Sequence, residues 1–147
     1  MTKRSAEHNT FAIERVYPAE PEQVFALWTT KQQKLRWFGM PDDPNFTLDF
    51  KVGGEEHSKG GPPDGVVYSY DAVYRDIVPN ERIVYHYTMD AGDDRISVSV
   101  TTVEFVADGS GTKLTYTEQG VFLDGLDTAA QREEGTTQLL EALGRAL

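Results

Sequence analysis

The chain has 147 residues, no cysteine and a formal net charge of −10 at pH 7, with a sequence pI of about 4.6. This length suffices for one domain with its own core, and the lack of cysteine excludes disulfides, thiolate metal sites and cysteine nucleophiles. The negative charge argues against nucleic acid or an anionic membrane as a partner. No apolar run could span a bilayer and no signal-peptide pattern is present, so we expect a cytoplasmic protein.

The first part of the chain is predicted to hold one strand and two short helices. Residues 1–9 are polar and are expected to form a flexible tail, with a single domain over 10–147. Residues 11–17 have strand composition. Pro21 is placed to start the first helix, and Thr30 can cap the second.

The middle of the chain is predicted to be a series of antiparallel strands, because apolar and polar residues alternate between turn-forming clusters of Gly, Pro, Asn and Asp. The predicted strands cover 45–52, 66–78, 82–89, 96–106 and 112–118, with a weaker strand after Gly53-Gly54. The apolar positions change register near Thr101, which predicts a bulge there.

Residues 124–147 are predicted to form a long amphipathic helix, with Asp127 as its N-cap. Its predicted buried face is bulky and apolar in the C-terminal half. In the N-terminal half this face is small or polar, where Glu133 and Thr136 lie beside Gly135. A helix that filled its groove would carry Leu or Ile there. We therefore expect a cavity between the sheet and this half of the helix, with Glu133 facing into it.

The order of these elements predicts an α+β fold in which a curved antiparallel sheet is covered by the last helix. It resembles the helix-grip fold of the START-like (SRPBCC) superfamily. Several motifs resemble the branch of that superfamily named for the activator of the ninety-kilodalton heat-shock protein's ATPase. They are Arg15-Val-Tyr-Pro-Ala-Glu-Pro21, Arg36-Trp37-Phe38-Gly39, Gly53-Gly54, Asp76-Ile-Val-Pro-Asn-Glu-Arg82 and Thr117-Glu-Gln-Gly120.

This resemblance implies the fold but not one function, because the superfamily includes lipid carriers, hormone receptors, cyclases and resistance proteins. Many relatives carry Gly-Trp in the last helix where this chain has Gly135-Thr136, which leaves more room at the expected cavity. The co-chaperone of that name also has a separate chaperone-binding domain, for which we find no counterpart. This difference argues against a chaperone partner.

Two glutamates are candidates for chemistry. If Glu118 faces the last helix, it can approach the same space as Glu133, and the two could act as acid and base in a hydrolase, cyclase or isomerase. The alternative is that each pairs with an arginine, for which Arg15, Arg36 and Arg75 are candidates, or reaches solvent at the mouth of the cavity. Structural ion pairs perturb carboxylates as readily as catalysis does, so both roles stay open.

The leading interpretation is a binding protein, not an enzyme, that holds a small apolar or aromatic molecule. The expected lining residues are Phe38, Met40, Tyr70, Tyr74, Tyr85, Tyr116, Glu118, Glu133 and Thr136. No histidine spacing fits a metal site, so neither a metal nor another cofactor is expected. A co-chaperone-like interaction module is the third hypothesis and would need an exposed apolar patch. A homodimer is compatible with the sequence.

Overall fold

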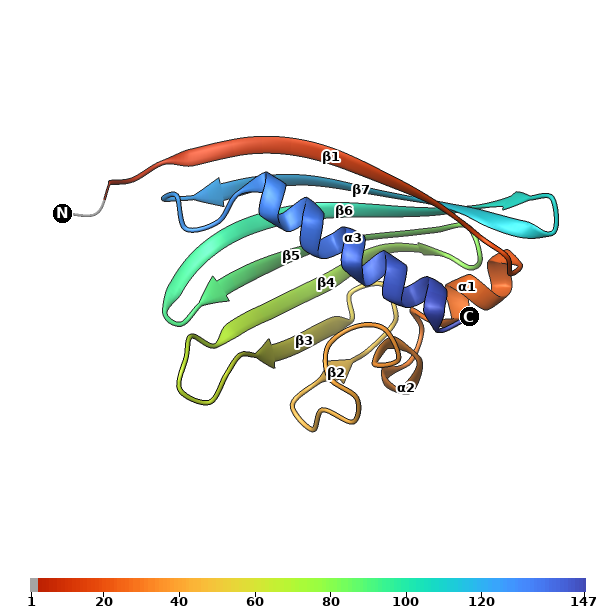
Figure 1. Ribbon diagram of the computed structural model, residues 1–147, viewed down its shortest axis with the longest axis horizontal. Coiled ribbons are helices and arrows are strands. Elements are labelled where there is room, and N and C mark those ends of the chain that lie inside the picture. Colours follow the sequence, from red (N-terminus) through yellow and green to blue (C-terminus); the bar gives the residue numbers. More distant parts are fainter. Residues whose placement is uncertain (1–2) are drawn as a thin grey trace.

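The computed structural model describes residues 3–147, which form a seven-stranded antiparallel sheet crossed by one long helix (Figure 1). The strands are β1 (Ala6–Tyr17), β2 (Thr47–Leu48), β3 (Glu55–Gly60), β4 (Tyr68–Val78), β5 (Arg82–Ala91), β6 (Asp94–Asp108) and β7 (Gly111–Leu123). The helices are α1 (Pro21–Ala26), α2 (Lys31–Lys34) and α3 (Ala129–Arg145). The strand order is β1-β7-β6-β5-β4-β3-β2, and every neighbouring pair is antiparallel.

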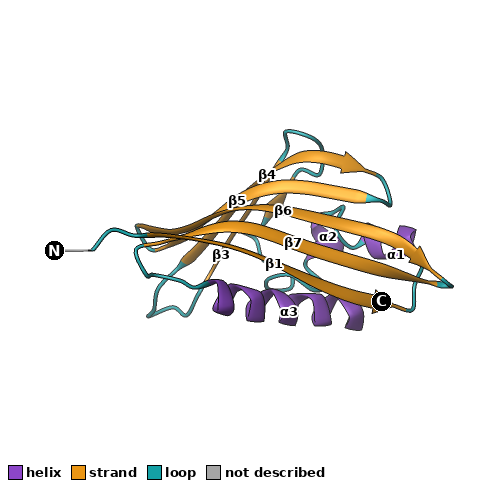
Figure 2. Ribbon diagram, turned by 90° about the horizontal axis from the view of Figure 1, so that it is seen from above, coloured by secondary structure: helices purple, strands orange, loops and turns teal. Residues whose placement is uncertain are grey.

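This arrangement is the helix-grip α+β fold that the sequence predicts. Figure 2 shows α3 lying along one face of the sheet. An antiparallel sheet with one apolar face needs such a cover, and α3 is the longest helix of the described residues. None of the helices in residues 3–147 has the length and apolar character needed to cross a membrane.

Strand β1 begins earlier than predicted. Residues 6–9 pair with residues 120–123 of β7, and the Ser5 backbone N–H donates to the Asp124 carboxylate. The prediction of a flexible tail is therefore wrong for residues 6–9, and Met1 and Thr2 lie outside the described residues. This end of β1 is exposed on both faces. An exposed strand end and a flexible tail are both polar in composition, so the sequence could not distinguish between them.

Strand β6 has no bulge at its centre, so the predicted register change near Thr101 is wrong. Residues 97–104 pair without interruption with β5, and Ser97 and Ser99 alternate inward. Val98 and Val100 point outward, 38% and 43% exposed. The apolar pattern led to a wrong register because inward positions 97 and 99 carry serines. The Ser97 hydroxyl accepts from Arg132 of α3, and the Ser99 hydroxyl donates to Glu118 of β7.

The starts of α2 and α3 show local capping. Thr30 accepts a hydrogen bond from the Gln33 backbone N–H, as predicted for α2. In α3 the N-cap is Thr128, whose hydroxyl accepts from the Gln131 N–H at 3.2 Å. The prediction of Asp127 as N-cap is wrong by one residue, because the Asp127 carboxylate pairs with a side chain of α3.

The C-terminal half of α3 packs in the hydrophobic core. Leu140 and Leu143 are fully buried in one cluster with residues of α1 and the sheet. The Tyr17 hydroxyl of β1 also donates to the Leu140 carbonyl at 2.7 Å. Trp28 belongs to the same cluster, and its ring centroid lies 4.6 Å from that of Trp37. The N-terminal half of α3 is held differently, by polar contacts beside a pocket.

Candidate functional site

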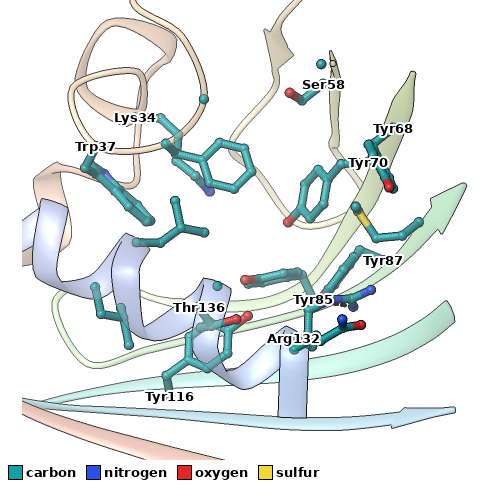
Figure 3. A pocket seen from close by; sticks show the side chains of 18 of the residues that line it. Lys34, Trp37, Ser58, Tyr68, Tyr70, Tyr85, Tyr87, Tyr116, Arg132 and Thr136 are labelled. Carbon is teal, nitrogen blue, oxygen red and sulfur yellow. Dashed lines mark hydrogen bonds between the residues drawn. The ribbon is translucent and has the colours of Figure 1, made fainter. Parts of the chain in front are cut away.

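A pocket of about 460 Å³ lies between α3 and the inner face of the sheet. Rings form much of its wall, and Figure 3 shows tyrosines reaching in from the strands, with Lys34 and Trp37 opposite. The aromatic lining residues are Trp28, Trp37, Phe38, Tyr68, Tyr70, Tyr85, Tyr87 and Tyr116. On α3 the wall includes Gly135 and Thr136. Apart from its chain neighbours and the backbone of α3, nothing in residues 3–147 lies within 4 Å of where a Gly135 side chain would begin, so Gly135 borders open space. Thr136 is buried beside it.

Several residues that the sequence analysis selected lie on this wall. They are Phe38, Tyr70, Tyr85, Tyr116 and Thr136. The tyrosines reach it because residues two apart in a strand share a face, so Tyr70 of β4 and Tyr85 of β5 both point inward. Their rings belong to a chain of close aromatic pairs in which Tyr70 and Tyr87 have centroids 4.8 Å apart. A role of these residues in binding stays a prediction.

The other four predicted lining residues, Met40, Tyr74, Glu118 and Glu133, are not part of this wall. Met40 is 68% exposed, in the loop after α2. Tyr74 is buried in the sheet, and its hydroxyl donates to Glu56. Glu133 is exposed, so the expectation that it faces the cavity is wrong. Arg132, one residue earlier on α3, takes the inward position.

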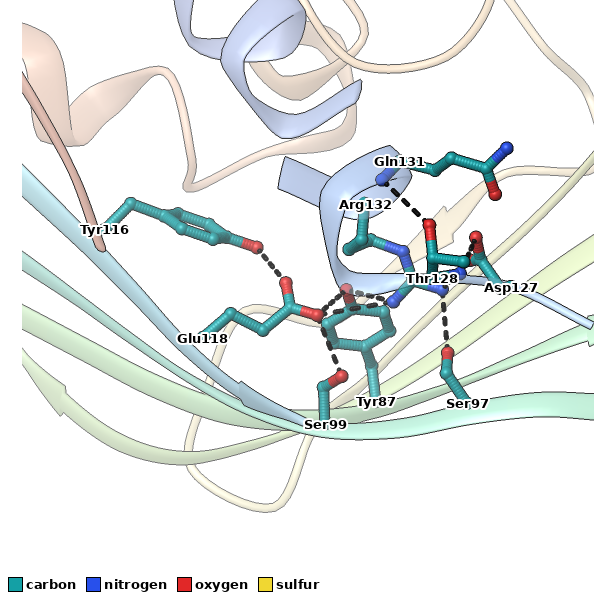
Figure 4. Close-up of polar contacts among 9 residues, drawn as sticks. All are labelled: Tyr87, Ser97, Ser99, Tyr116, Glu118, Asp127, Thr128, Gln131 and Arg132. Atoms are coloured by element: carbon teal, nitrogen blue, oxygen red, sulfur yellow. Dashed lines mark hydrogen bonds and ion pairs between the residues drawn. The ribbon is translucent and has the colours of Figure 1, made fainter. Parts of the chain in front are cut away.

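Glu118 is fully buried and bonded on both of its oxygens (Figure 4). Its Oε2 accepts from the Tyr87 hydroxyl at 2.7 Å, from Ser99 at 2.8 Å and from Arg132 at 3.3 Å. Its Oε1 accepts from the Tyr116 hydroxyl at 3.1 Å. Glu118 thus ties α3 to the sheet. The predicted acid–base pair does not form, because Glu133 lies on the exposed side of the helix.

Arg132 completes this cluster from the helix side. Its Nη1 donates to the Tyr87 hydroxyl at 2.8 Å, and its Nη2 donates to Ser97 at 2.7 Å and to Asp127 at 2.8 Å. Burial alone lowers the pKa of Arg132, but Tyr87, Glu118 and Asp127 together raise it above its usual value. The guanidinium is therefore a permanent charge with two carboxylate partners.

An arginine partner for Glu118 was one of the alternatives left open by the sequence, but the partner is Arg132 and not Arg15, Arg36 or Arg75. Arg15 pairs with Glu141 at 2.8 Å, Arg36 donates to the Ala146 carbonyl, and Arg75 donates to His86. The missed signal is the pair of inward serines on β6. Hydroxyl groups at buried strand positions need partners, and a charged cluster on the facing helix supplies them.

A second buried ion pair lies on the α2 side of the pocket. Lys34 and Glu56 have side chains that are 1% and 0% exposed, with Nζ and Oε1 3.1 Å apart. The Lys34 ammonium lies 5.0, 5.2 and 4.8 Å from the ring centroids of Trp28, Trp37 and Phe38. Burial lowers the pKa of Lys34, and Glu56 offsets only part of this effect. The sequence analysis selected neither Lys34 nor Glu56.

The pocket also offers neutral polar groups. Burial raises the pKa of Tyr70, Tyr85, Tyr87 and Tyr116 well above the usual value, so these hydroxyls keep their protons at neutral pH. No side-chain hydrogen bond of the Tyr70 hydroxyl is found within residues 3–147, whereas the Tyr116 hydroxyl donates to Glu118. No group of three His, Asp or Glu residues in the described part of the chain could hold a metal ion.

Comparisons with known proteins agree on the fold. A family model described as "Activator of Hsp90 ATPase homolog 1-like protein" matches residues 18–147. The Mll3558 protein from Rhizobium loti is 48% identical with a TM-score of 0.94, over 97% of this chain and 99% of that one. An uncharacterised protein from Rhizobium leguminosarum is 44% identical with a TM-score of 0.93, over 99% and 97%. Protein CV1439 from Chromobacterium violaceum, 23% identical with a TM-score of 0.75 over 93% and 95%, shares the fold. Curated proteins give no match.

Proposed function

The chain belongs to the family of Activator of Hsp90 ATPase homolog 1-like proteins, and we propose that it binds a small, largely aromatic molecule between α3 and the sheet. The observation that carries this proposal is the ring-lined pocket of about 460 Å³ beside Gly135 and Thr136. Pockets for small molecules commonly measure roughly 300 to 1,000 Å³, with mostly apolar walls and a few directed polar groups. Burial against these rings would supply most of the binding free energy.

The geometry of the wall favours a flat ligand. Neighbouring rings such as Phe38 and Tyr70 already meet edge to face, with centroids 5.3 Å apart. A flat aromatic ligand can extend this packing, because rings prefer edge-to-face or offset contacts. The free Tyr70 hydroxyl would add one directed hydrogen bond to a polar group of the ligand.

The charges around the pocket favour a neutral ligand. Two cations, Lys34 and Arg132, line the pocket together with one carboxylate, Asp127. Glu56 pairs with Lys34, and Glu118 and Asp127 pair with Arg132. Both cations already have anionic partners, so neither is available to a ligand carboxylate without breaking a buried pair. The polar end of the ligand is therefore a hydroxyl, carbonyl or similar group. Tyr70, and not the two glutamates of the sequence analysis, would orient it.

The proposal is tested by filling the pocket. Thr136→Trp places an indole where the helix borders open space, and Gln138→Trp places the same group on the exposed side of α3. We expect N-phenylnaphthylamine, a neutral aromatic dye, to bind the wild type and Gln138→Trp alike and to bind Thr136→Trp about tenfold more weakly or worse. Circular dichroism checks that all three proteins are folded. Equal binding by all three would contradict the proposal.

Two further measurements sharpen it. Anilinonaphthalene sulfonate has a similar ring system with a negative charge, and we expect it to bind more weakly than the neutral dye. Native mass spectrometry of protein purified from its own host, compared with denatured protein, would reveal a molecule that leaves on unfolding. Tighter binding of the anionic dye would overturn the assignment of a neutral ligand while leaving the pocket itself in place.

A further inference from the structure

We propose that Lys34 is a reactive amine that condenses with the carbonyl group of an aromatic aldehyde or ketone held in the pocket, forming an imine. This inference rests on the proposed function, since the same pocket must admit the carbonyl compound. It adds a covalent step that simple binding does not require. Two features of the α2 side of the pocket support it: the setting of the amine and the carboxylate beside it.

The amine lies where its charged form is poorly solvated. Lys34 belongs to the pocket wall, and Figure 3 shows it reaching inward beside Trp37. Its Nζ lies about 5 Å from three ring centroids, which replace the water that normally surrounds an ammonium. The lowered pKa of Lys34 agrees with this setting. The neutral form, which carries the nucleophilic electron pair, is therefore more accessible than in an exposed lysine.

A proton acceptor lies beside the amine. Glu56 Oε1 is 3.1 Å from Lys34 Nζ and also accepts from the Tyr74 hydroxyl. The second oxygen, Oε2, is buried and has no hydrogen-bond partner within residues 3–147. A carboxylate with a free buried oxygen is placed to take the ammonium proton and to return it later, which is the task of a general acid–base.

The step balances without an oxidant or reductant. Lys34 transfers its ammonium proton to Glu56, and the neutral Nζ attacks the carbonyl carbon to form a C–N bond. A second proton moves from the nitrogen to the carbonyl oxygen, which becomes the hydroxyl of a carbinolamine. Protonated Glu56 gives its proton to this hydroxyl, which leaves as water while the nitrogen electron pair forms the C=N bond. The third proton stays on the nitrogen, so one ammonium and one carbonyl compound yield one protonated imine and one water, with the Glu56 carboxylate again beside the positive charge.

The test traps the imine with a reductant. The wild-type protein is incubated near neutral pH with naphthaldehyde and sodium cyanoborohydride, which reduces an imine to a stable secondary amine, and the adducts are located by peptide mass spectrometry. Lys51, whose side chain is 70% exposed, is an internal reference within the same chain. We expect Lys34 to be labelled about tenfold faster than Lys51 or more, because burial lowers the pKa of Lys34 and makes its neutral, nucleophilic form more accessible.

Two controls locate the reaction. N-phenylnaphthylamine should slow labelling of Lys34 and leave Lys51 unaffected, because the dye competes for the pocket. Lys34→Met should lose the fast adduct, and Lys34→Met combined with Glu56→Gln keeps the control available if the single variant does not fold. If the dye binds but Lys34 is labelled no faster than Lys51, the imine proposal fails and the binding proposal stands. If the dye does not bind and Lys34 is not labelled, both fail.

Discussion

The two buried carboxylates on either side of the pocket have the same charge and different surroundings. Glu118 and Glu56 are both fully buried and each pairs with a cation, while Glu118 accepts from two tyrosines and Glu56 from one. Glu118 has donors on both oxygens, whereas both donors to Glu56 meet at Oε1 and leave Oε2 without a partner in the described chain. Because both Glu118 oxygens accept hydrogen bonds, the Glu118–Arg132 cluster has a structural role and holds α3 on the sheet. Because Glu56 Oε2 accepts none from the described residues, the Lys34–Glu56 cluster keeps an oxygen that can take up a proton.

The cations explain this difference. Arg132 presents several N–H groups in a plane and reaches four acceptors, on β5, β6, β7 and the loop before α3. Lys34 is a compact charge with one oxygen acceptor from Glu56, and its remaining surroundings are rings. Cation–π contacts compensate only part of the solvation that a buried ammonium loses. The first cluster therefore tolerates burial well, and the second depends on a single contact.

The largest expected effect comes from removing the carboxylate of the satisfied cluster. Glu118→Leu leaves Arg132 with only Asp127 as an anionic partner and leaves the hydroxyls of Tyr87 and Ser99 without their acceptor. Breaking such a buried pair costs about 3–5 kcal/mol. Urea denaturation measures this loss of the free energy of unfolding. Glu118→Gln keeps an acceptor oxygen and should cost less. A loss below about 1 kcal/mol for Glu118→Leu would show that the cluster does not fasten α3.

The next largest loss of stability is expected when the Lys34–Glu56 pair is broken. Lys34→Met keeps the packing against the rings but leaves the buried Glu56 without its cation, and we expect a loss of about 3 kcal/mol in the free energy of unfolding. Adding Glu56→Gln removes the unpaired charge and keeps an acceptor for Tyr74. The double variant should recover most of the loss, again by urea denaturation. A double variant less stable than the single one would contradict this account of the pair.

A smaller effect compares one tyrosine hydroxyl at each cluster. Tyr74→Phe removes one of the two donors to Glu56, and we expect a loss of about 2 kcal/mol in the free energy of unfolding. Tyr87→Phe leaves Glu118 with donors on both oxygens, from Ser99, Arg132 and Tyr116, and should cost about 1 kcal/mol. Thermal or urea unfolding of the two variants side by side tests the order. A larger loss of stability for Tyr87→Phe than for Tyr74→Phe would contradict the proposed difference between the two clusters.

The sequence predicted the fold and part of the pocket wall for a physical reason. Strand alternation fixes which tyrosines share a face, so Tyr70, Tyr85 and Tyr116 were placed correctly. Helical spacing is less decisive. Position 132 and position 133 both fit the spacing from Ala129 to Thr136, and the choice of Arg132 depends on acceptors from other elements.

The second cluster was beyond prediction from periodicity. Lys34 ends a helix of four residues, which is too short to define a face. Glu56 lies in β3, a strand whose polar sequence carries no apolar alternation to set its register. The pairing of the two side chains depends on how α2 packs against the sheet, which is a property of the tertiary structure.

The smallest expected effect on stability comes from an ionic cluster on the exposed face of the sheet. His57 lies between Asp71 and Glu55, with Nδ1 2.6 Å from Asp71 and Nε2 2.9 Å from Glu55. The hydrogen bond with Asp71 raises the pKa of His57 above its usual value. The His57 side chain is 43% exposed, so water and salt screen the cluster and its contribution to stability stays below about 1 kcal/mol.

The raised pKa of His57 sets the direction in which the stability contributed by this cluster changes with pH. Because the pKa of His57 is higher in the folded protein, the stabilisation is fully present below the unfolded pKa of about 6.5 and is lost as the pH rises through the folded value. Titration of the His57 ring protons by NMR should give a raised pKa, and Asp71→Asn should lower it. Added salt should reduce the effect at His57 while leaving the cost of Glu118→Leu nearly unchanged, because the buried cluster is shielded from ions. Equal salt sensitivity at the two places would mean that burial is not what separates them.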